Sequence, residues 1–519
     1  MRRWAATVTS LALLLAAGCA GDSDPVQGDR SRHPPIVVVV FDEFPTDSLT
    51  VPGGALDGER YPNFARLAAT STWFRNASTV YDSTFKAVPA ILDGKRPKSG
   101  SAPDVRSHKP SVYHLVDSLG YDVFKVESAS AVCPPDICPG AHTRRPGVLA
   151  RLAGPGRPAR FHRWLAAIHP RERPGFYFHH ALLPHEPWVY LPSGRRDRPQ
   201  GSDPIRGINK PPAFDDKQLT IHSRLRHILQ VGFVDRELGL LLRRLRQTGL
   251  LEDALVFVTA DHGYSFDRNV ASRRLVTDRS IDQIAPVPFF VKLPGQSTGQ
   301  VNTSLVRTID IVPTIAAALG AEVWWRHDGA PVFSAAARAR RQVALVTRDF
   351  TRVIRIGAAE LARRREANRR RWARLYGTGA QSRLLFGDPW SEAYRIGPRH
   401  GLLGRKVAEL QTLPRGPVGA RIYNARLLYA VSARSELFPT RVAGRLSGIR
   451  PGRTRVVAAA VNGRIEAVTR TFHLWREDRE FFSMLVPESV LRSGRNRVEL
   501  FEVRPGDELV PLPQRQRTL

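Results

Sequence analysis

Apolar runs that stop abruptly at acidic residues are the clearest pattern along the chain. Residues 255–260 are mostly β-branched or aromatic, and Asp261 and His262 follow them directly. Residues 36–41 form a similar run that ends at Asp42. Continuous apolar runs of this length predict buried strands of a parallel sheet. In open α/β sheets, the carboxyl edge of such strands is where ligands bind.

The polar residues at these two strand ends suit a divalent metal ion. The carboxylates of Asp42 and Asp261 are hard oxygen ligands, and His262 offers an imidazole nitrogen. Gly263 allows the backbone to turn tightly behind them. The alternative interpretation is that the acidic residues cap helices and that the histidine is an ordinary surface residue.

Apolar residues at other spacings predict the elements between these strands. Residues 225–246 carry leucine and isoleucine on one helical stripe, and residues 61–68 show a similar spacing. Short apolar runs at 120–126, 176–183 and 289–291 predict further strands. The larger part of the chain is therefore expected to be an α/β domain.

The pattern changes near residue 340, and the 519 residues exceed what a single core usually organises. Residues 343–356 predict a hairpin, and an arginine-rich helix follows at 363–374. From residue 417, short strands alternate with turn residues such as Asn462-Gly463, which is typical of a β-sandwich. We therefore expect three regions: an α/β domain (35–340), a hairpin and basic helical linker (341–415), and an all-β module (416–519).

The N-terminus has the pattern of an export signal. Two arginines precede an apolar run that is too short to span a bilayer as a mature helix. Its end, LLLAAGC, resembles a bacterial lipoprotein signal, in which Cys19 becomes the lipidated first residue. We predict a signal peptide (1–19) and a polar tether (20–34), and a protein held by one lipid at the outer face of the cell membrane. Cleavage as an ordinary secretory peptide stays open.

The distribution of charge indicates which class of binding partner the protein has. The formal net charge is +30, but the basic residues are mostly arginines spread along the whole chain, without a zinc-finger, RNP or Gly-rich nucleic-acid motif. This distribution disfavours nucleic acid as the partner and favours anionic lipids, wall polymers, or a phosphorylated or sulfated substrate.

Cys133 and Cys138 are expected to form a local disulfide rather than a metal pair, since the predicted compartment is oxidising.

Two further segments offer candidate catalytic groups. Ser83 and Thr84 precede a helix of small residues, so a hydroxyl there lies where the helix dipole favours an anion, or serves as an ordinary N-cap. His185 lies between prolines that stiffen its loop, which suits a group fixed over an oxyanion or leaving group; a structural histidine is the alternative. His179 and His180 point to opposite faces of their strand, so at most one can face the site.

An ordered set of motifs resembles the sulfatase-like branch of the alkaline phosphatase superfamily over roughly residues 35–325. The motifs are IVVVVFDE, YPNFARLAATSTWFRNAS, STFKAVPAILDGKRP, FYFHHALLPHEPWVYLPSG, LVFVTADHG, VPFFVKLPG and RTIDIVPTIAAALG. The resemblance implies a mixed, mostly parallel sheet between helices, with the metal and the nucleophile at the carboxyl edge.

The resemblance also implies roles for individual residues. Asp42, Asp261 and His262 match metal ligands, and Glu43 occupies the place of a second acidic residue that some members use. Thr84 matches the nucleophile position and would also contact the metal. His185 matches an active-site histidine of the branch. The expected cofactor is one divalent ion, with Mn, Mg, Zn and Ca all open.

The nucleophile position departs from the sulfatase pattern. Thr84 cannot be converted to formylglycine, and Lys86 and Val88 replace the Pro and Arg of the Cys-x-Pro-x-Arg signature. A threonine instead resembles the nucleophile of lipoteichoic acid synthases and suits phosphoryl transfer. Ser83 is the alternative nucleophile. Lys86 and Lys292 are weaker candidates for binding the anion.

These observations predict a metal-dependent hydrolase or phosphotransferase that acts outside the cytoplasm on phosphate or sulfate esters, free or linked to lipid or polymer. Phosphate esters are favoured. One alternative is a catalytically degenerate cell-envelope protein that binds anionic polymer. A true sulfatase would need another nucleophile, and a nucleic-acid binder would show a steep salt dependence of DNA affinity.

Overall fold

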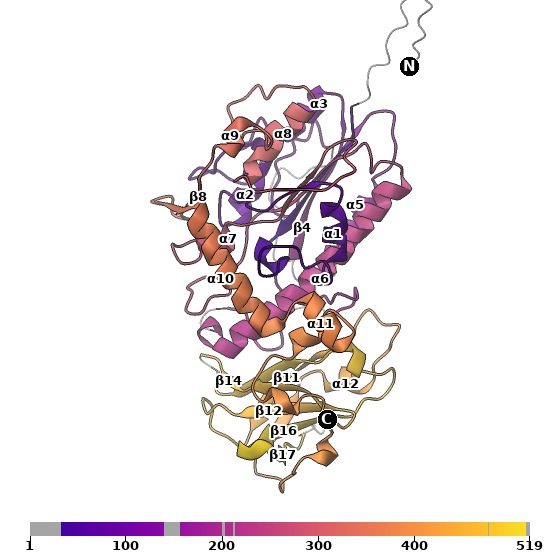
Figure 1. Ribbon diagram of the computed structural model, residues 1–519, viewed down its shortest axis with the longest axis vertical. Helices are drawn as coiled ribbons and strands as arrows, with labels where there is room; N and C mark the ends of the chain where they lie inside the picture. The colour runs from indigo at the N-terminus through magenta and orange to yellow at the C-terminus, as the bar shows by residue number, and fades with distance from the viewer. Residues whose placement is uncertain (1–32, 140–155, 200–202, 211–212, 476, 515–519) are drawn as a thin grey trace, which may run out of the picture. The chain divides into compact units, whose positions relative to one another are not determined.

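A seven-stranded sheet forms the centre of the larger part of the protein (Figure 1). The computed structural model describes residues 33–139, 156–199, 203–210, 213–475 and 477–514, and the strand order within them is β3-β4-β1-β5-β6-β2-β7. The strands are β1 (Ile36–Asp42), β2 (Thr72–Phe74), β3 (Asp122–Val126), β4 (Gly175–Pro184), β5 (Leu255–Ala260), β6 (Phe289–Lys292) and β7 (Gln300–Asn302).

The direction of the strands confirms the predicted mixed, mostly parallel sheet. β1 lies between β4 and β5 and runs parallel to both. Among the described strands of this sheet, only β6 runs antiparallel to its neighbours. All seven residues of β1 are buried, as expected for a strand covered on both faces.

Helices cover both faces of this sheet. Val37, Val39 and Phe41 of β1 pack in one apolar cluster with α1 (Pro62–Ala68), α5 (Gly156–Ala166) and α6 (Lys217–Gln247). Ile36, Val38 and Val40 point the other way and pack with α2 (Thr84–Asp93), α3 (Val112–Ser118) and α8 (Ile311–Ala318). The alternation of side chains along a strand therefore gives β1 a role in two separate cores.

The helix α6 begins eight residues before the predicted start at 225. Asp216 caps its N-terminus by accepting a hydrogen bond from the backbone N–H of Leu219. The added turns contain polar residues that are nevertheless buried, including His222 and Arg224, and the buried Arg226 follows them. Residues of the C-terminal region contact these turns, as in the ion-pair network that joins Arg226 and Arg441 to Asp203. The spacing of apolar residues in α6 does not by itself predict that the C-terminal region covers these turns.

The C-terminal region forms a separate set of antiparallel sheets, which confirms the predicted all-β module. In the described part of the chain, the sheets have the orders β10-β11-β15-β14 and β13-β12-β16-β17, and their inner faces share one apolar cluster. The strands are β10 (Gly419–Ile422), β11 (Arg441–Ser447), β12 (Val456–Val461), β13 (Arg464–Arg470), β14 (Phe472–His473), β15 (Glu480–Leu485), β16 (Val498–Val503) and β17 (Leu509–Pro511). The two-residue turn Asn462-Gly463 joins β12 and β13, with positive φ at both residues.

A hairpin and the arginine-rich helix connect the two parts. β8 (Gln342–Val346) pairs with β9 (Val353–Gly357), and α10 (Ala358–Tyr376) follows. One face of α10 is buried, so this helix is more than the solvated basic helix that its sequence suggests. The remaining short helices are α7 (Ile281–Ile284), α9 (Ala335–Arg338), α11 (Gly379–Phe386) and α12 (Ala425–Tyr429), with 3-10 turns at η1 (Thr46–Ser48), η2 (Ala213–Asp215), η3 (Thr308–Asp310), η4 (Ser391–Tyr394), η5 (His400–Leu402), η6 (Val407–Glu409), η7 (Glu488–Val490) and η8 (Pro505–Asp507).

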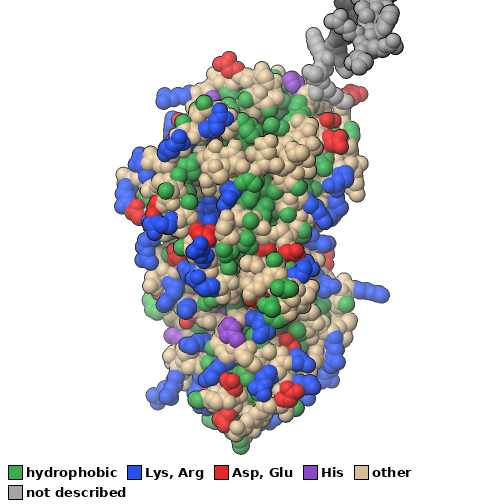
Figure 2. Space-filling model, in the orientation of Figure 1, with side chains coloured by type: hydrophobic (Ala, Val, Ile, Leu, Met, Phe, Trp, Pro, Cys, Tyr) green, Lys and Arg blue, Asp and Glu red, His purple; other side chains and the backbone are tan. Residues whose placement is uncertain are grey.

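The N-terminal segment, the two later cysteines and the surface charge were also the subject of predictions. The predicted signal peptide and Cys19 lie outside the described residues. Cys133 and Cys138, the predicted pair, are joined by a disulfide. Within the described ranges, no helix is long and apolar enough to cross a bilayer. On the face drawn in Figure 2, lysine and arginine side chains are scattered over the surface rather than gathered in one patch.

Candidate active site

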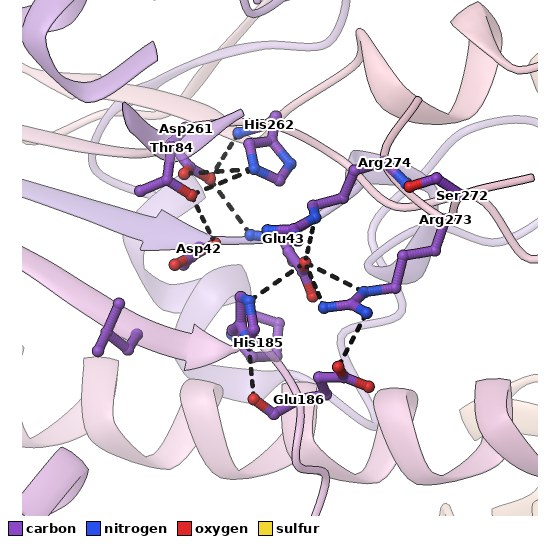
Figure 3. A network of polar contacts seen from close by, with 12 residues as sticks. Asp42, Glu43, Thr84, His185, Glu186, Asp261, His262, Ser272, Arg273 and Arg274 are labelled. Carbon is purple, nitrogen blue, oxygen red and sulfur yellow. Dashed lines mark hydrogen bonds and ion pairs between the residues drawn. The ribbon is translucent and has the colours of Figure 1, made fainter. Parts of the chain in front are cut away.

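The ends of β1 and β5 bring three predicted residues together at the carboxyl edge of the sheet (Figure 3). The two strands are paired in parallel register, from Ile36 opposite Leu255 to Phe41 opposite Ala260. Asp42, Asp261 and His262 follow this register and are all buried. Their candidate ligand atoms lie within 4.8 Å of one another. Strand pairing therefore assembles an oxygen- and nitrogen-rich cluster from two distant parts of the chain.

Thr84 lies against this cluster. It is the first residue of α2, and its Oγ1 is 3.4 Å from Asp42 Oδ1 and 3.3 Å from His262 Nε2. Ser83, the other candidate hydroxyl, is the N-cap residue, and its side chain forms no capping hydrogen bond. The structure thus directs the threonine, at the positive end of a helix, toward the carboxylates.

The polar side-chain atoms that face the cluster are of the kind that a divalent cation binds. His262 Nδ1 lies 2.8 Å from the carbonyl oxygen of Gly263, so Nδ1 carries the proton and leaves the lone pair of Nε2 facing the cluster. Asp261 Oδ1 accepts from two backbone N–H groups, of Glu43 and His262. Its second oxygen, Oδ2, is buried without a hydrogen-bond partner among the described residues. These atoms, with those of Asp42, are suitable metal ligands.

The charge of the cluster supports the same conclusion. Burial raises the pKa of Asp42 well above its usual value, and the nearby carboxylates of Asp261 and Glu43 raise it further. Burial also raises the pKa of Asp261. Buried carboxylates that lie close together repel one another and lose hydration. A divalent cation held by Asp42, Asp261 and His262 would relieve both effects.

Glu43 forms the second half of the site. Its backbone adopts a left-handed conformation, with φ of 59°, and its carboxylate is fully buried. Oε1 lies 3.2 Å from Arg273 Nη2 and 3.4 Å from Arg274 Nε. Burial alone would raise the pKa of Glu43, but Arg273, His185 and Arg274 more than offset it and hold the pKa well below its usual range. Glu43 is close enough to Asp42 and His185 to share a cation with them, and it already pairs with two guanidinium groups.

His185 faces Glu43 from the loop after β4. Its Nδ1 lies 2.6 Å from the carbonyl oxygen of Glu186, so this nitrogen donates and Nε2 faces the site, 3.3 Å from Glu43 Oε1. Burial lowers the pKa of His185 to about 3, so the ring is neutral at ordinary pH. Gln230 and Arg157 both donate to the carbonyl oxygen of His185, which fixes the loop.

The structure adds His180 to the predicted residues. Its Nε2 lies 3.8 Å from Asp42 Oδ2, and neither ring nitrogen has a hydrogen-bond partner among the residues described. His179 points to the opposite face and packs against Phe161 and Trp164. The alternation along β4 had limited the site to one of the two histidines, and the register of β4 with β1 selects His180.

The two lysines predicted to bind the anion lie elsewhere. Lys86 Nζ donates to the carbonyl oxygens of Lys98 and Ser101. Lys292 Nζ donates to the carbonyl oxygen of Glu252, before the start of β5. Because β6 is antiparallel to β5, its last residue lies at the opposite edge of the sheet from the cluster. Arg273 and Arg274, which no sequence pattern marked, contribute the positive charge at the site instead.

Comparison with known proteins places a recognised domain within this fold. Residues 159–321 match the family model described as Sulfatase. A ulvan-active sulfatase of Formosa agariphila is 25% identical over 114 residues, which cover 22% of this chain and 18% of that protein. The phosphonate monoester hydrolase of Agrobacterium radiobacter is 15% identical with a TM-score of 0.46, over 64% of this chain and 83% of that one. The phosphonate monoester hydrolase of Silicibacter pomeroyi is 20% identical with a TM-score of 0.43, over 60% and 79%.

Proposed function

We propose that this chain, which carries a sulfatase-family region at residues 159–321 as the sequence resemblance predicted, is a metal-dependent hydrolase or phosphotransferase of phosphate or sulfate esters. The observation that carries the proposal is the position of Thr84. Its hydroxyl lies at a helix N-terminus within hydrogen-bonding distance of Asp42 and His262, beside an unpartnered oxygen of Asp261. This arrangement presents one hydroxyl to one cation-binding cluster.

The first step is attack by Thr84. A divalent ion held by Asp42, Asp261 and His262 would supply positive charge that lowers the pKa of the Thr84 hydroxyl and attracts an anionic ester. The Thr84 hydroxyl releases its proton to solvent, and Oγ1 forms a bond to phosphorus. The bond between phosphorus and the ester oxygen breaks, and the leaving alcohol takes a proton from solvent. The contacts to Asp42 and His262 fix the direction of Oγ1 before the attack.

The second step frees Thr84. The hydroxyl of water, or of an acceptor alcohol, attacks phosphorus in the phosphorylated threonine. The bond between phosphorus and Oγ1 breaks, and Oγ1 takes a proton from solvent. His185 enters this step neutral, with Nδ1 held as a donor to Glu186, so Nε2 is the atom that takes the proton of the attacking hydroxyl. Water as acceptor gives a hydrolase, and an alcohol gives a phosphotransferase.

Arg274 is the group we assign to the oxygens of the ester anion. Arg273 is engaged by Glu43 and by Glu186, whose Oε1 lies 2.8 Å from its Nη1. Arg274 has a single ion pair, with Glu43, and its Nε has no hydrogen-bond partner among the described residues. Its side chain is 31% exposed, so it borders both the buried cluster and the solvent. Guanidinium groups bind phosphate and sulfate oxygens well.

The threonine supports phosphate over sulfate esters, because a threonine cannot supply the formylglycine on which usual sulfatases depend. The N-terminal pattern supports action outside the cytoplasm, with an anchor at Cys19. The net charge of +30 supports an anionic ester linked to a lipid or a wall polymer.

The test combines metal analysis with a substrate panel. Purified protein is loaded with Mn, Mg, Zn or Ca and assayed with phosphomonoesters, phosphodiesters, phosphonate monoesters and sulfate esters. Thr84→Ala should lose nearly all turnover while it stays folded and keeps its metal, whereas Thr84→Ser should retain part of it. Ser83→Ala is the matched control and should remain active.

Two results would contradict the proposal. Full activity of Thr84→Ala would remove the threonine from the nucleophile role. If the purified protein bound an anionic polymer but contained no metal and showed no turnover, it would instead be a catalytically degenerate binding protein.

A further inference from the structure

Arg224, in the second turn of α6, is a buried cation that lacks a carboxylate partner. Its side chain is 4% exposed. In the described part of the chain it forms no ion pair, and its Nε has no hydrogen-bond acceptor. Burial lowers the pKa of Arg224 to about 10, so the guanidinium still carries its charge at neutral pH. A buried charge without a partner is costly, and the surroundings of Arg224 should contain something that offsets it.

Two aromatic rings close to the guanidinium provide part of this compensation. The guanidinium carbon lies 4.4 Å from the ring centroid of Trp372, in α10, and 5.3 Å from that of Phe266. Phe266 follows Asp261 and His262 in the same loop. Cation–π contacts stabilise the guanidinium, but they do not neutralise its charge.

A small polar cavity lies beside Arg224. Its volume is about 40 Å³, and it is lined by residues of α6, α10 and the segment 47–61. This is room for roughly three water-sized spheres, or for one small ion with a water. Thr50 also lines the cavity, and its hydroxyl is buried without a hydrogen-bond partner among the described residues.

The other charged groups in the lining are already balanced. Asp47 accepts from Arg365 and Arg369. Asp57 accepts from the backbone N–H of Gly379 and lies 3.8 Å from a guanidinium nitrogen of Arg60. Arg60 also donates to three backbone carbonyl groups. Asp47 attracts Arg224 at longer range, but among the described residues Arg224 is the charged group of this lining that has no direct ion pair.

We propose that this cavity binds a small monovalent anion of the size of chloride. The anion neutralises Arg224 and accepts a hydrogen bond from the Thr50 hydroxyl. One ligand therefore supplies the partner that each of these two side chains lacks. Because Phe266 stacks on Arg224, the anion also stabilises the loop that carries Asp261 and His262. The site is separate from the Thr84 cluster and does not depend on the proposed reaction.

Thermal unfolding of the wild-type protein tests the proposal directly. At constant ionic strength, replacing gluconate, which is too large for the cavity, with chloride or bromide should raise the Tm by about 1–3 °C in a saturable manner. The same Tm in all three salts would overturn the proposal and show that the cavity holds only water.

Variants assign the effect to this cavity. Arg224→Met and Thr50→Val should each abolish or weaken the halide dependence. Arg371→Met is the matched control, since Arg371 also stacks on Trp372, at 4.3 Å, but pairs with Asp267 and is 41% exposed. Its halide response should be unchanged. If Arg224→Met fails to fold, Thr50→Val provides the test, and bromide located by anomalous diffraction outside the cavity would contradict the assignment.

Discussion

Thr84 Oγ1 and His262 Nε2 lie 3.3 Å apart, although one residue begins a helix and the other follows a strand. The hydrogen bond from His262 Nδ1 to the Gly263 carbonyl group orients the ring so that Nε2 is directed at the hydroxyl. A candidate metal ligand and a candidate nucleophile are thus held in position by the backbone before any substrate binds. This arrangement leads to four predictions beyond the threonine variants.

Asp261→Asn should lose the metal. The substitution keeps the shape of the side chain but removes the charge of the unpartnered Oδ2, so metal affinity should fall by more than about 100-fold. Elemental analysis of the purified variant measures this loss, and chelation should lower the Tm of the wild type but not of the variant. Asp267→Asn, in the same loop but paired with Arg371, should keep its metal. Metal retained at the wild-type level by Asp261→Asn would contradict the ligand assignment.

His185→Gln should slow the second step more than the first. Without Nε2 to accept the proton of the attacking hydroxyl, turnover should fall by about 10²–10⁴ and the phosphorylated threonine should accumulate. Mass spectrometry of the intact protein during turnover detects this species. His162→Gln is the control, because His162 is half exposed and pairs with Glu237. Turnover lost without accumulation of the intermediate would place His185 in the first step.

Arg274→Met should weaken the reaction with anionic esters. The variant keeps the aliphatic part of the side chain but loses the guanidinium, so kcat/KM should fall on the order of 100-fold. Steady-state kinetics of the metal-loaded protein measures the change. Lys292→Met should leave kcat/KM unchanged, since its ammonium group lies at the opposite edge of the sheet. Equal losses in both variants would argue against a direct contact of Arg274 with the substrate.

Asp203 should make stability depend on pH. Burial alone would raise the pKa of this carboxyl, but Arg441, Arg198 and Arg226 more than offset it and hold the pKa well below its usual value. Its stabilising contribution is therefore complete above the unfolded-state pKa of about 4 and is lost as the pH falls toward the folded-state pKa. Asp203→Asn should cost about 3–5 kcal/mol at pH 7, and this difference should shrink below about pH 4. Urea unfolding at several pH values measures it, and a constant difference would refute the charge effect.

The carboxyl-edge residues were predictable from the sequence. The runs that precede Asp42 and Asp261 are apolar on both faces, and such strands pair in a buried parallel sheet whose carboxyl ends coincide. The same reasoning placed the Thr84 hydroxyl at a helix N-terminus, because the small residues after it favour a helix. Period and composition are local properties, so they can be read without knowledge of the rest of the chain.

The direction of β6, the choice of His180 and the positions of Arg273 and Arg274 were decided only by the tertiary structure. An apolar run such as Phe289–Lys292 predicts a strand but not its direction, and the antiparallel direction takes Lys292 away from the site. The loop after His262 has no periodicity that indicates where its arginines return to Glu43. The early turns of α6 are likewise covered in part by the C-terminal region, since Arg226 and Arg441 pair with the same carboxylate of Asp203. Local pattern determined which side chains carry the chemistry, whereas long-range packing determined which charges surround them.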